Sequence, residues 1–580
     1  MTPQEALHTY FGYESFRSMQ EAIISSVLAG NDTLALLPTG GGKSLCFQVP
    51  TLVMASENEN EGLCLVITPL IALMRDQVEN LRQRGIMATA IYTGMTAEEQ
   101  RIAYDNCLYG PYRFLYVSPE RLESDDFIKR IVQLPVYMIA VDEAHCISQW
   151  GYDFRPSYLR IAAIREQLDV PVLALTATAT PQVVEDIQQR LHFPKPNVFR
   201  TSFARENLHY VVRRCQDKQQ QLLHILSRMQ GSTIVYVRNR KRTKELSELI
   251  NSQLSTLNSQ LSTFYHAGLP ATERTAKQQA WKEDRTRIIV CTNAFGMGID
   301  KPDVRLVIHY DMPDSLEAYF QEAGRAGRDG EEAWCVMLYA PEDKRTVNRR
   351  IYDNYPDAEQ IAFVYDRLCD YLVIGLGSGQ GASFAIDVEQ FCTDMHLSFL
   401  TTYAALQLLT NAGYIRFEQE QDLHPRVRIL VSKEETYHLG ESPFQERLLS
   451  ALMRRYTGIF TDAQFVHLPR LAEDLATSEF AVNSSLVAMA KQHIIKYIPA
   501  QRVSMVAFPV NRQEQVILPD SVYTDRRQAF ARNIEAMTGY VENDRFCRSQ
   551  MLLGYFGEND APPCGMCDIC LQKKAKNTPQ

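Results

Sequence analysis

Short runs of apolar residues recur through the first 175 positions, and each run ends in polar side chains. The runs lie at residues 33–37, 63–67, 114–117, 138–141 and 171–175. Between them are longer stretches in which apolar positions repeat every three to four residues. Such runs are typical of strands buried on both faces, and the longer repeats are typical of helices. The alternation predicts an α/β unit with a parallel sheet, whose ligands bind at the carboxyl ends of its strands.

A second series of the same kind follows residues 195–207, which contain Lys195-Pro196-Asn197 and are predicted to form a linker. Its apolar runs lie at residues 233–237, 288–291 and 306–309, and the series ends near residue 340. We therefore predict a second α/β unit of similar build.

The pattern changes after the second unit. Helical stretches at 388–391 and 402–412 are followed by apolar runs at 414–417 and 427–431, which flank a polar tip. This order predicts a winged-helix module whose wing is made by those two runs. Residues 443–518 are predicted to repeat the scheme, with wing strands at 494–497 and 503–508. The pattern leaves open whether these modules bind nucleic acid or only pack against protein, since the tip at Gln419–His424 is acidic and has no aromatic residue.

Composition narrows the class of protein. The chain has 580 residues, of which 45% are hydrophobic and 22% charged, as expected for several globular domains. A net charge of −9 excludes a uniformly basic surface but leaves room for a local basic groove. No stretch approaches the roughly twenty apolar residues that span a bilayer, and no signal peptide is expected. Of thirteen cysteines, nine are scattered among apolar runs and four cluster near the C-terminus, which suits a reducing cytosol.

The first apolar run leads into the glycine-rich segment 36–44, and a helical pattern begins after it. A strand, a glycine turn and a helix beginning with Lys-Ser form the layout of a phosphate-binding loop. Backbone N–H groups of such a loop face one anion, and the helix N-terminus adds its positive dipole end. The residues expected to hold the nucleotide are Thr39, Gly40, Gly41, Gly42, Lys43 and Ser44. Lys43 would reach the β- and γ-phosphates and Ser44 would bind Mg²⁺. The alternative is a glycine turn that binds nothing.

Two carboxylates follow the apolar run at 138–141. Asp142 is suited to hold Mg²⁺ directly or through water, and Glu143 to polarise the attacking water. His145 is suited to carry the state of the γ-phosphate onward. Because the pair shares a chain with a phosphate-binding loop, it predicts nucleotide hydrolysis. The alternative is a solvated strand end.

The loop directly after the carboxylates holds Trp150, Phe154 and Arg155. Exposed aromatic and arginine side chains are what single-stranded bases stack on, so this loop predicts contact with nucleic acid. The alternative is a small satellite core.

Another aromatic and basic cluster lies ahead of the phosphate-binding loop. Tyr13 or Arg17 could stack on a nucleotide base there, and the Gln20 amide could read adenine through a donor–acceptor pair. Taken alone, this segment is better explained as an ordinary helix start.

Residues 321–330 close the second unit with the sequence Gln-Glu-Ala-Gly-Arg-Ala-Gly-Arg-Asp-Gly. Arg325 and Arg328 are three residues apart, so they point the same way on a helix or tight turn. Across a cleft from Lys43 they would neutralise the γ-phosphate as charge builds, the role of an arginine finger. The alternative is an exposed basic turn.

Taken in order, these segments resemble the helicase motifs of RecQ-family DNA helicases over roughly residues 5–340. The matching segments are 11–20, 38–44, 68–70, 142–145, 150–155, 176–178, 265–268, 292–300 and 321–328. The Gln-Trp-Gly-x-Asp-Phe-Arg-Pro loop at 149–156 points to RecQ rather than to superfamily 2 in general. The resemblance implies two RecA-like domains, with ATP in the cleft between them and single-stranded DNA across the top.

The resemblance also implies a role for each matched residue. The residues implied to hold adenine are Tyr13, Arg17 and Gln20. Those implied to couple DNA to hydrolysis are Trp150, Phe154 and Arg155. Arg328 is implied to be the finger, with Arg325 supporting it.

Four cysteines near the end form a Cys-x16-Cys-x2-Cys-x2-Cys array: Cys547, Cys564, Cys567 and Cys570. With its flanking residues the array resembles the RecQ zinc-binding subdomain. Four thiolates suit a closed tetrahedral Zn²⁺ site, and an iron–sulfur cluster is the alternative. The site is expected to fix Arg548 and its neighbours as a packed, partly basic face. In most of the family this subdomain follows the helicase core directly, whereas here about 185 residues intervene.

The predicted fold is therefore α/β, with two RecA-like parallel-sheet domains, winged-helix-like modules and a small C-terminal helical zinc-binding subdomain. The expected domains are residues 1–200, 201–343, 344–440, 441–520 and 521–580.

The predicted function is an ATP-dependent DNA helicase that moves 3′→5′ and serves DNA repair or recombination, with the polarity taken from the resemblance. The alternatives are a double-strand DNA translocase or RNA helicase on the same motor, or a DNA-binding scaffold without catalysis. ATP, Mg²⁺ and Zn²⁺ are the expected cofactors. The expected partners are single-stranded and duplex DNA, with a single-strand-binding protein or other repair proteins, and no membrane. The expected location is the cytoplasm, at the nucleoid if the chain is bacterial.

Overall fold

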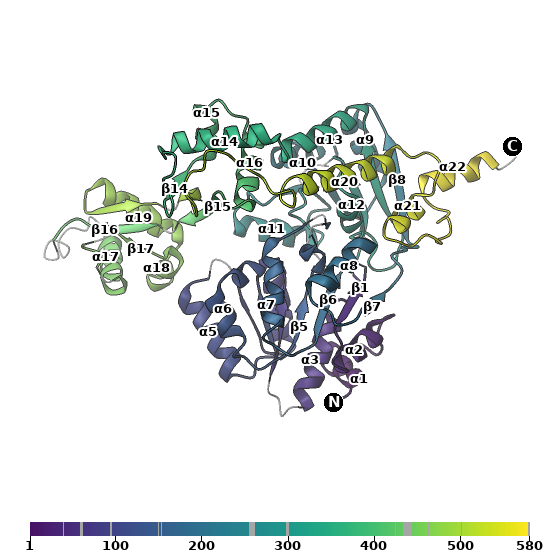
Figure 1. Ribbon diagram of the computed structural model, residues 1–580, viewed down its shortest axis with the longest axis horizontal. Helices are drawn as coiled ribbons and strands as arrows, with labels where there is room; N and C mark the ends of the chain where they lie inside the picture. Colours follow the sequence, from purple (N-terminus) through teal and green to yellow (C-terminus); the bar gives the residue numbers. More distant parts are fainter. Residues whose placement is uncertain are drawn as a thin grey trace. The chain divides into compact units, whose positions relative to one another are not determined.

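The computed structural model divides the chain into two compact units, residues 1–349 with 528–580, and residues 350–527 (Figure 1). The residues that the structure describes are 1–38, 40–57, 62–92, 95–148, 150–151, 153–254, 261–296, 301–423, 425–432, 443–456, 458–461, 463–499 and 501–577. Thr39, Gln149, Tyr152 and residues 297–300 of the matched segments lie outside this description.

The first lobe of the first unit is built on a seven-stranded parallel sheet in the order β3-β4-β2-β5-β6-β1-β7. Its strands are β1 (Thr33–Leu36), β2 (Leu63–Ile67), β3 (Ala88–Ile91), β4 (Phe114–Val117), β5 (Val136–Val141), β6 (Val172–Thr176) and β7 (Val198–Arg200). Its helices are α1 (Pro3–Ala6), α2 (Gln20–Leu28), α3 (Leu45–Glu57), α4 (Ile71–Gln83), α5 (Ala97–Tyr109), α6 (Asp125–Ile131), α7 (Ile161–Arg165) and α8 (Pro181–Arg190). Every residue of β1, β2, β4 and β6 is buried, which is why their apolar runs are continuous rather than alternating.

Strand β7 falls inside the segment predicted to be a linker, so that prediction is wrong for residues 198–200. β7 pairs in parallel with β1, and Arg200 stands opposite Leu36. Asn197 fixes this approach, because its carbonyl accepts from Leu34 N at 2.9 Å and its Nδ2 donates to Asp32 O at 2.7 Å. The last strand of the sheet therefore lies directly beside the strand that leads into the phosphate-binding loop.

The second lobe has a six-stranded parallel sheet in the order β10-β11-β9-β12-β13-β8. Its strands are β8 (Leu208–Arg214), β9 (Ser232–Tyr236), β10 (Ser262–Tyr265), β11 (Ile288–Cys291), β12 (Val304–His309) and β13 (Ala333–Tyr339). Its helices are α9 (Lys218–Arg228), α10 (Arg240–Leu254), α11 (Ala271–Lys282), α12 (Leu316–Ala323) and α13 (Pro341–Asn354). The two parallel-sheet lobes confirm the predicted fold class.

The C-terminal residues return to the second lobe. They form α20 (Thr524–Glu542), α21 (Arg548–Tyr555) and α22 (Asp568–Asn577), and α21 and α22 lie beside β8 (Figure 1). Glu542 at the end of α20 accepts hydrogen bonds from Tyr339 Oη and Lys344 Nζ, each at 3.0 Å. The segment that follows the long insertion is thus tied to the end of β13 and to α13.

The second unit contains two winged-helix folds, one inserted into the other. The outer fold consists of α14 (Ala358–Tyr371), β14 (Ser383–Ile386), α15 (Val388–Asp394), α16 (Phe399–Asn411), β15 (Arg416–Leu423) and β19 (Gln501–Ala507). The inner fold consists of β16 (Arg426–Ile429), α17 (Pro443–Arg455), β17 (Gln464–Phe465), α18 (Leu468–Asp474), α19 (Glu479–Lys491) and β18 (Ile495–Ile498). Their antiparallel sheets have the orders β14-β19-β15 and β17-β16-β18.

The predicted pairing of the wing strands is wrong. β15 pairs with β19, where Phe417 stands opposite Val506, and β16 pairs with β18, where Val427 stands opposite Tyr497. The cores follow this pairing, because Phe417 and Val506 belong to one buried cluster and Val427 to another. Each of the four strands mixes apolar and polar residues, so its pattern does not single out a partner. The side chains of the tip at 419–424 lie outside the described residues.

Candidate active site and metal centre

The glycine-rich segment forms a tight loop between β1 and α3, as predicted. Gly40 and Gly42 adopt left-handed conformations with φ of +81° and +74°, which glycine reaches without strain. A Cβ on Gly42 would also collide with the Gln20 amide. Both positions therefore require glycine for the loop to keep this shape.

Arg17 and Gln20 bind the loop itself. Arg17 Nη1 donates to Gly40 O at 2.6 Å, and Gln20 Nε2 donates to Gly42 O at 3.0 Å. Gln20 Oε1 accepts from Arg17 N at 2.8 Å, so both ends of the buried amide have partners within the chain. Reading adenine would require the amide to leave these partners. Tyr13 is 49% exposed, which leaves its ring open to a base.

Lys43 and Ser44 occupy the first turn after the loop. Lys43 Nζ donates to Leu37 O at 3.4 Å, and burial lowers the pKa of Lys43, against the opposing charges of Glu143 and Asp142. Ser44 Oγ accepts from Gln77 Nε2 at 3.3 Å.

Gln77 is in turn fixed by the sheet, because its Oε1 accepts from the Tyr116 hydroxyl on β4 at 2.8 Å. Gln77 on α4 and Tyr116 were missed by sequence reasoning, since neither belongs to a recognisable pattern.

The two carboxylates lie at the carboxyl end of β5. Asp142 accepts from Thr68 Oγ1 at 3.3 Å and from Glu143 N at 3.0 Å. Burial raises the pKa of Asp142, the Glu143 charge raises it further, and Lys43 opposes the rise. Burial likewise raises the pKa of Glu143, opposed by Lys43 and Arg325. The positive charge of Lys43 therefore acts on both carboxylates, and that of Arg325 acts on Glu143, as expected for groups predicted to share one site.

His145 links the carboxylates to the neighbouring strand. Its Nδ1 lies 2.9 Å from Thr176 Oγ1 at the end of β6 and 3.4 Å from Glu143 Oε2. Burial lowers the pKa of His145 to about 4, so the imidazole is neutral at neutral pH. A neutral ring between Glu143 and Thr176 can pass on a change at the carboxylate without taking up a charge.

The arginine turn follows α12 and reaches the phosphate-binding loop. A Cβ built on Gly40 would lie 3.4 Å from Cγ and Cδ of Arg328. Arg325 is buried, its Nη1 donates to Gly296 O, and its charge acts on Glu143. The structure thus brings Arg325 and Arg328 to the edge of the site that holds Lys43.

The aromatic loop is half-buried. The Trp150 ring lies under the Arg532 guanidinium of α20, with 5.6 Å from Cζ to the ring centroid. Arg155 pairs with Asp153 at 3.2 Å, and Phe154 is partly buried nearby. Arg532 was missed by sequence reasoning, because nothing local marks it as a neighbour of Trp150.

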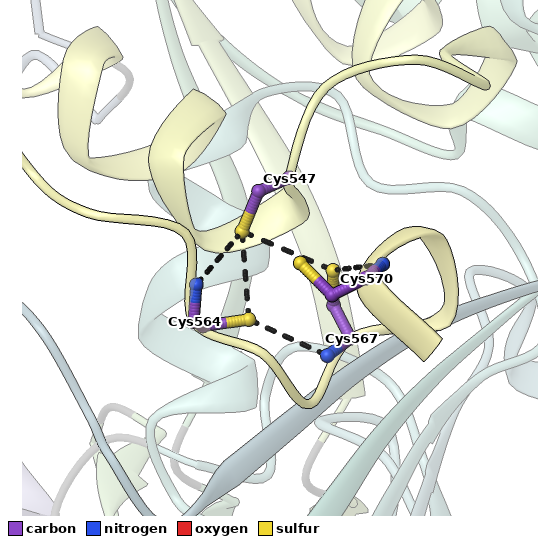
Figure 2. A group of neighbouring side chains, drawn as sticks. All are labelled: Cys547, Cys564, Cys567 and Cys570. Carbon is purple, nitrogen blue, oxygen red and sulfur yellow. Dashed lines mark hydrogen bonds between the residues drawn. The ribbon is translucent and has the colours of Figure 1, made fainter. Parts of the chain in front are cut away.

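The four C-terminal cysteines converge on one point (Figure 2). Their Sγ atoms all lie within 4.8 Å of one another, and a tetrahedral Zn²⁺ with bonds of about 2.3 Å would place them about 3.8 Å apart. Backbone N–H groups of Cys564, Cys567 and Cys570 donate to neighbouring Sγ atoms at 3.3–3.4 Å. The set fits a closed four-thiolate metal site.

The expectation of a partly basic face beside this site is wrong for Arg548. Its side chain is only 2% exposed and pairs with Asp568, with 3.0 Å from Nε to Oδ1. Asp568 Oδ2 also accepts from Val212 N of β8 at 3.0 Å. The pair anchors the cysteine cluster to the edge of the second sheet, so its charge is not available to a ligand.

Four stretches match models of known families. Residues 17–187 match the DEAD/DEAH box helicase family, and 217–330 match the helicase conserved C-terminal domain. Residues 427–499 match the RecQ helicase winged-helix domain of Bacteroidota, and 510–571 match the RecQ zinc-binding family.

Several bacterial proteins are similar to this chain. It is 40% identical over 365 residues to the probable ATP-dependent DNA helicase RecS of Bacillus subtilis, covering 62% of this chain and 71% of RecS. It is 42% identical over 344 residues to the ATP-dependent DNA helicase RecQ of B. subtilis, covering 59% of this chain and 56% of that protein. The RecQ protein of Pasteurella multocida is 39% identical and is covered over 55% of its length. The chain thus spans little more than half of these two RecQ proteins.

Among solved structures, the DUF1998 helicase MrfA bound to DNA is similar in fold. Its TM-score is 0.50 at 19% identity, with 61% of this chain and 50% of that chain covered. At this identity the likeness concerns the fold alone.

Proposed function

Because this chain belongs to the RecQ family of ATP-dependent DNA helicases, we propose that it hydrolyses ATP between its two lobes and uses the cycle to separate DNA strands. It moves 3′→5′ along a single strand and serves repair or recombination. The observation that carries the proposal is a convergence of groups from both lobes. Lys43, Asp142 and Glu143 come from the first lobe, and Arg325 and Arg328 come from the second.

In this proposal the phosphate-binding loop holds the triphosphate. The N–H groups of Gly40 and Gly42 face the phosphates, while Gly41 N donates to Pro38 O at 2.9 Å and closes the turn. Lys43 binds the β- and γ-phosphate oxygens. Ser44 and Asp142 would hold Mg²⁺, which would offset the negative charge of the phosphates. The hydrogen bond from Gln77 to Ser44 supports this role, because it fixes the hydroxyl oxygen with a lone pair still free.

Hydrolysis requires one base and one counter-charge. Glu143 takes a proton from the attacking water, whose oxygen bonds to the γ-phosphorus as the bond to the bridging oxygen breaks and ADP leaves with that electron pair. Arg328, supported by Arg325, offsets the negative charge that builds on the γ-phosphate. The raised pKa of Glu143 supports the assignment, since a more basic carboxylate accepts a proton more readily.

The DNA site adjoins this chemistry, and the metal site uses other residues. Trp150, Phe154 and Arg155 contact single-stranded bases and transmit that contact to the adjoining strand end. The four cysteines would hold one Zn²⁺, and a site whose ligands are all protein thiolates would serve structure rather than substrate binding. Tyr13 stacks on the adenine base.

The proposed setting is the bacterial cytoplasm at the nucleoid, with a single-strand-binding protein or other repair proteins as partners. None of the thirteen cysteines, all of which the structure describes, forms a disulfide, which supports a reducing compartment. Among the described residues, no helix has the length and apolar character of a membrane span.

ATP hydrolysis by the full chain, measured with different nucleic acids, tests this proposal. We expect strong stimulation by single-stranded DNA, weaker stimulation by blunt duplex DNA and little by RNA, with no activity in Lys43→Ala. Equal stimulation by RNA would favour an RNA helicase, and stimulation by duplex alone a double-strand translocase. No hydrolysis with any nucleic acid would overturn the proposal in favour of a scaffold.

A further inference from the structure

The residues that close helix α21 touch the second lobe at α12, the helix that leads into the arginine turn. Tyr555 Oη donates to Glu317 Oε1 at 2.8 Å. The Phe556 ring centroid lies 5.1 Å from that of Phe320. Glu317 is only 3% exposed, and a buried carboxyl group without a partner is costly, so the Tyr555 hydroxyl holds this helix in place.

The same residues also touch the first lobe. Arg200 Nη1 donates to Phe556 O at 3.3 Å, and Arg200 stands opposite Leu36 at the end of β1. Gly557 packs on Pro181 at the start of α8, where an added Cβ would lie 2.9 Å from the proline Cγ. Its φ of +90° independently favours glycine. These contacts rest on β7, which pairs with the strand that leads into the phosphate-binding loop, and on the first residue of α8.

The chain segment that joins the two lobes is held by the next residue. Glu558 accepts from Phe203 N at 2.8 Å and from Ser202 Oγ at 2.7 Å. The Phe203 ring is fully buried and packs against both Phe320 and Phe556, with centroids at 5.9 and 5.3 Å. One short segment therefore contacts both lobes and their connection.

We propose that residues 555–558 form a strut that sets how far the arginine turn reaches toward the phosphate-binding loop. Tyr555 and Glu317 are then positioning residues for ATP hydrolysis, acting through α12 on Arg325 and Arg328. A helix moves as a rigid body, so a shift at Glu317 is carried to the turn that follows Ala323. This inference rests on the proposed function, because it needs the two arginines to act in hydrolysis.

Tyr555→Phe tests the strut by removing one hydroxyl group. The matched control is Tyr339→Phe, which removes a tyrosine–glutamate hydrogen bond of 3.0 Å to Glu542 in the same unit, between β13 and α20, with neither partner on α12. We expect Tyr555→Phe to lower kcat of DNA-stimulated hydrolysis about tenfold, because small misplacements of catalytic groups are costly, with KM for ATP nearly unchanged. Tyr339→Phe should leave both constants within twofold of the wild type.

The affinity for ADP with aluminium fluoride gives a second readout, which should not change if the contact only stabilises the fold. This mimic of the transferring phosphoryl group should bind Tyr555→Phe about tenfold more weakly, while ADP alone binds as in the wild type. Glu317→Gln keeps an oxygen that accepts from Tyr555, so it should behave as the wild type, whereas Glu317→Leu should behave as Tyr555→Phe. Bound zinc should stay at one ion per chain throughout.

Hydrogen exchange of residues 316–328 in the nucleotide-free protein tests whether the strut holds α12 and the arginine turn in place. This measurement does not depend on activity. Exchange should rise in Tyr555→Phe and not in Tyr339→Phe. Equal exchange in the two variants, or equal affinity for the fluoride complex, would overturn the inference while leaving the proposed function intact. If the wild type does not hydrolyse ATP, both the proposed function and the positioning role are overturned. The hydrogen-exchange result would still show whether residues 555–558 hold α12 in place.

Discussion

The side chain of Arg328 lies against Gly40, so that a Cβ on the glycine would sit 3.4 Å from both Cγ and Cδ of the arginine. The two residues come from different lobes, and each belongs to a segment that the sequence marks for phosphate chemistry. Gly40 also has φ of +81°, which disfavours any side chain there. An added Cβ would thus just touch the arginine, and it is the left-handed backbone that makes glycine the favoured residue where the two lobes meet.

Arg328→Ala is expected to lower kcat for ATP hydrolysis by about 10³-fold while ATP still binds, because an arginine finger acts mainly on the transition state. Single-turnover hydrolysis and nucleotide binding measure the two effects separately. Arg285→Ala, which removes an exposed arginine paired with Glu283, is the control and should change neither. A tenfold loss of ATP affinity with unchanged kcat would assign Arg328 to ground-state binding instead.

Glu143→Gln is expected to bind ATP and DNA but to hydrolyse ATP orders of magnitude more slowly. The amide keeps the shape of the side chain and removes the base, and the Mg²⁺ ligand Asp142 stays in place. Rapid-quench measurement of ATP cleavage checks this. Turnover within threefold of the wild type would sink the assignment of Glu143 as the base.

Trp150→Ala combined with Phe154→Ala is expected to uncouple DNA from hydrolysis. Basal ATP hydrolysis should survive, while stimulation by single-stranded DNA and strand separation should fall together, because the stacking surface is lost. Trp150→Phe keeps an aromatic face and should retain most of the stimulation. If the double variant is stimulated as strongly as the wild type, the loop serves packing alone.

The cysteine cluster is expected to hold one Zn²⁺ per chain. Replacing Cys567 by Ala in the full chain should release the metal and reduce solubility and DNA binding more than intrinsic ATP hydrolysis, because the residues predicted to hydrolyse ATP all lie within 1–340. Elemental analysis of the purified protein decides the metal. Iron with visible absorbance, or no bound metal, would contradict the zinc assignment.

His145 predicts a loss of stability in acid. Its pKa is about 4 in the folded chain and near 6.5 when exposed, so between these values the unfolded chain binds a proton that the folded chain does not. Stability therefore falls as pH drops from about 6.5 to about 4, by about 3 kcal/mol for this residue. Between pH 7.5 and pH 5, the thermal midpoint of the His145→Gln variant should fall less than that of the wild type. Parallel losses in both proteins would show that other groups dominate.

Local patterns predicted the parts of the site that are local. Short stretches of sequence were enough to recognise the phosphate-binding loop, the carboxylates after β5 and the four cysteines. Their chemistry needs those residue types at fixed spacing. The paired arginines were found in the same way. Their arrival beside Gly40 depends on packing of two lobes, which no short pattern contains.

Other features depend on partners that are distant in sequence. Gln77 and Arg532 are single polar residues on helices, and only the fold brings them to Ser44 and Trp150. Arg548 was expected to make the packed face beside the cysteines partly basic, but Asp568 neutralises it in the interior. The nesting of the winged-helix folds was missed because β15 could pair equally well with its neighbour β16 or with β19.

Strand separation on tailed duplexes tests whether this chain uses ATP to unwind DNA in the 3′→5′ direction. The full chain is mixed with a short DNA duplex that carries a single-stranded tail at either the 3′ or the 5′ end, and release of the labelled strand is followed with and without ATP. We expect ATP-dependent release from the 3′-tailed duplex, little release from the 5′-tailed one, and none with Lys43→Ala or Glu143→Gln. Release that needs no ATP, or that survives in both variants, would contradict it.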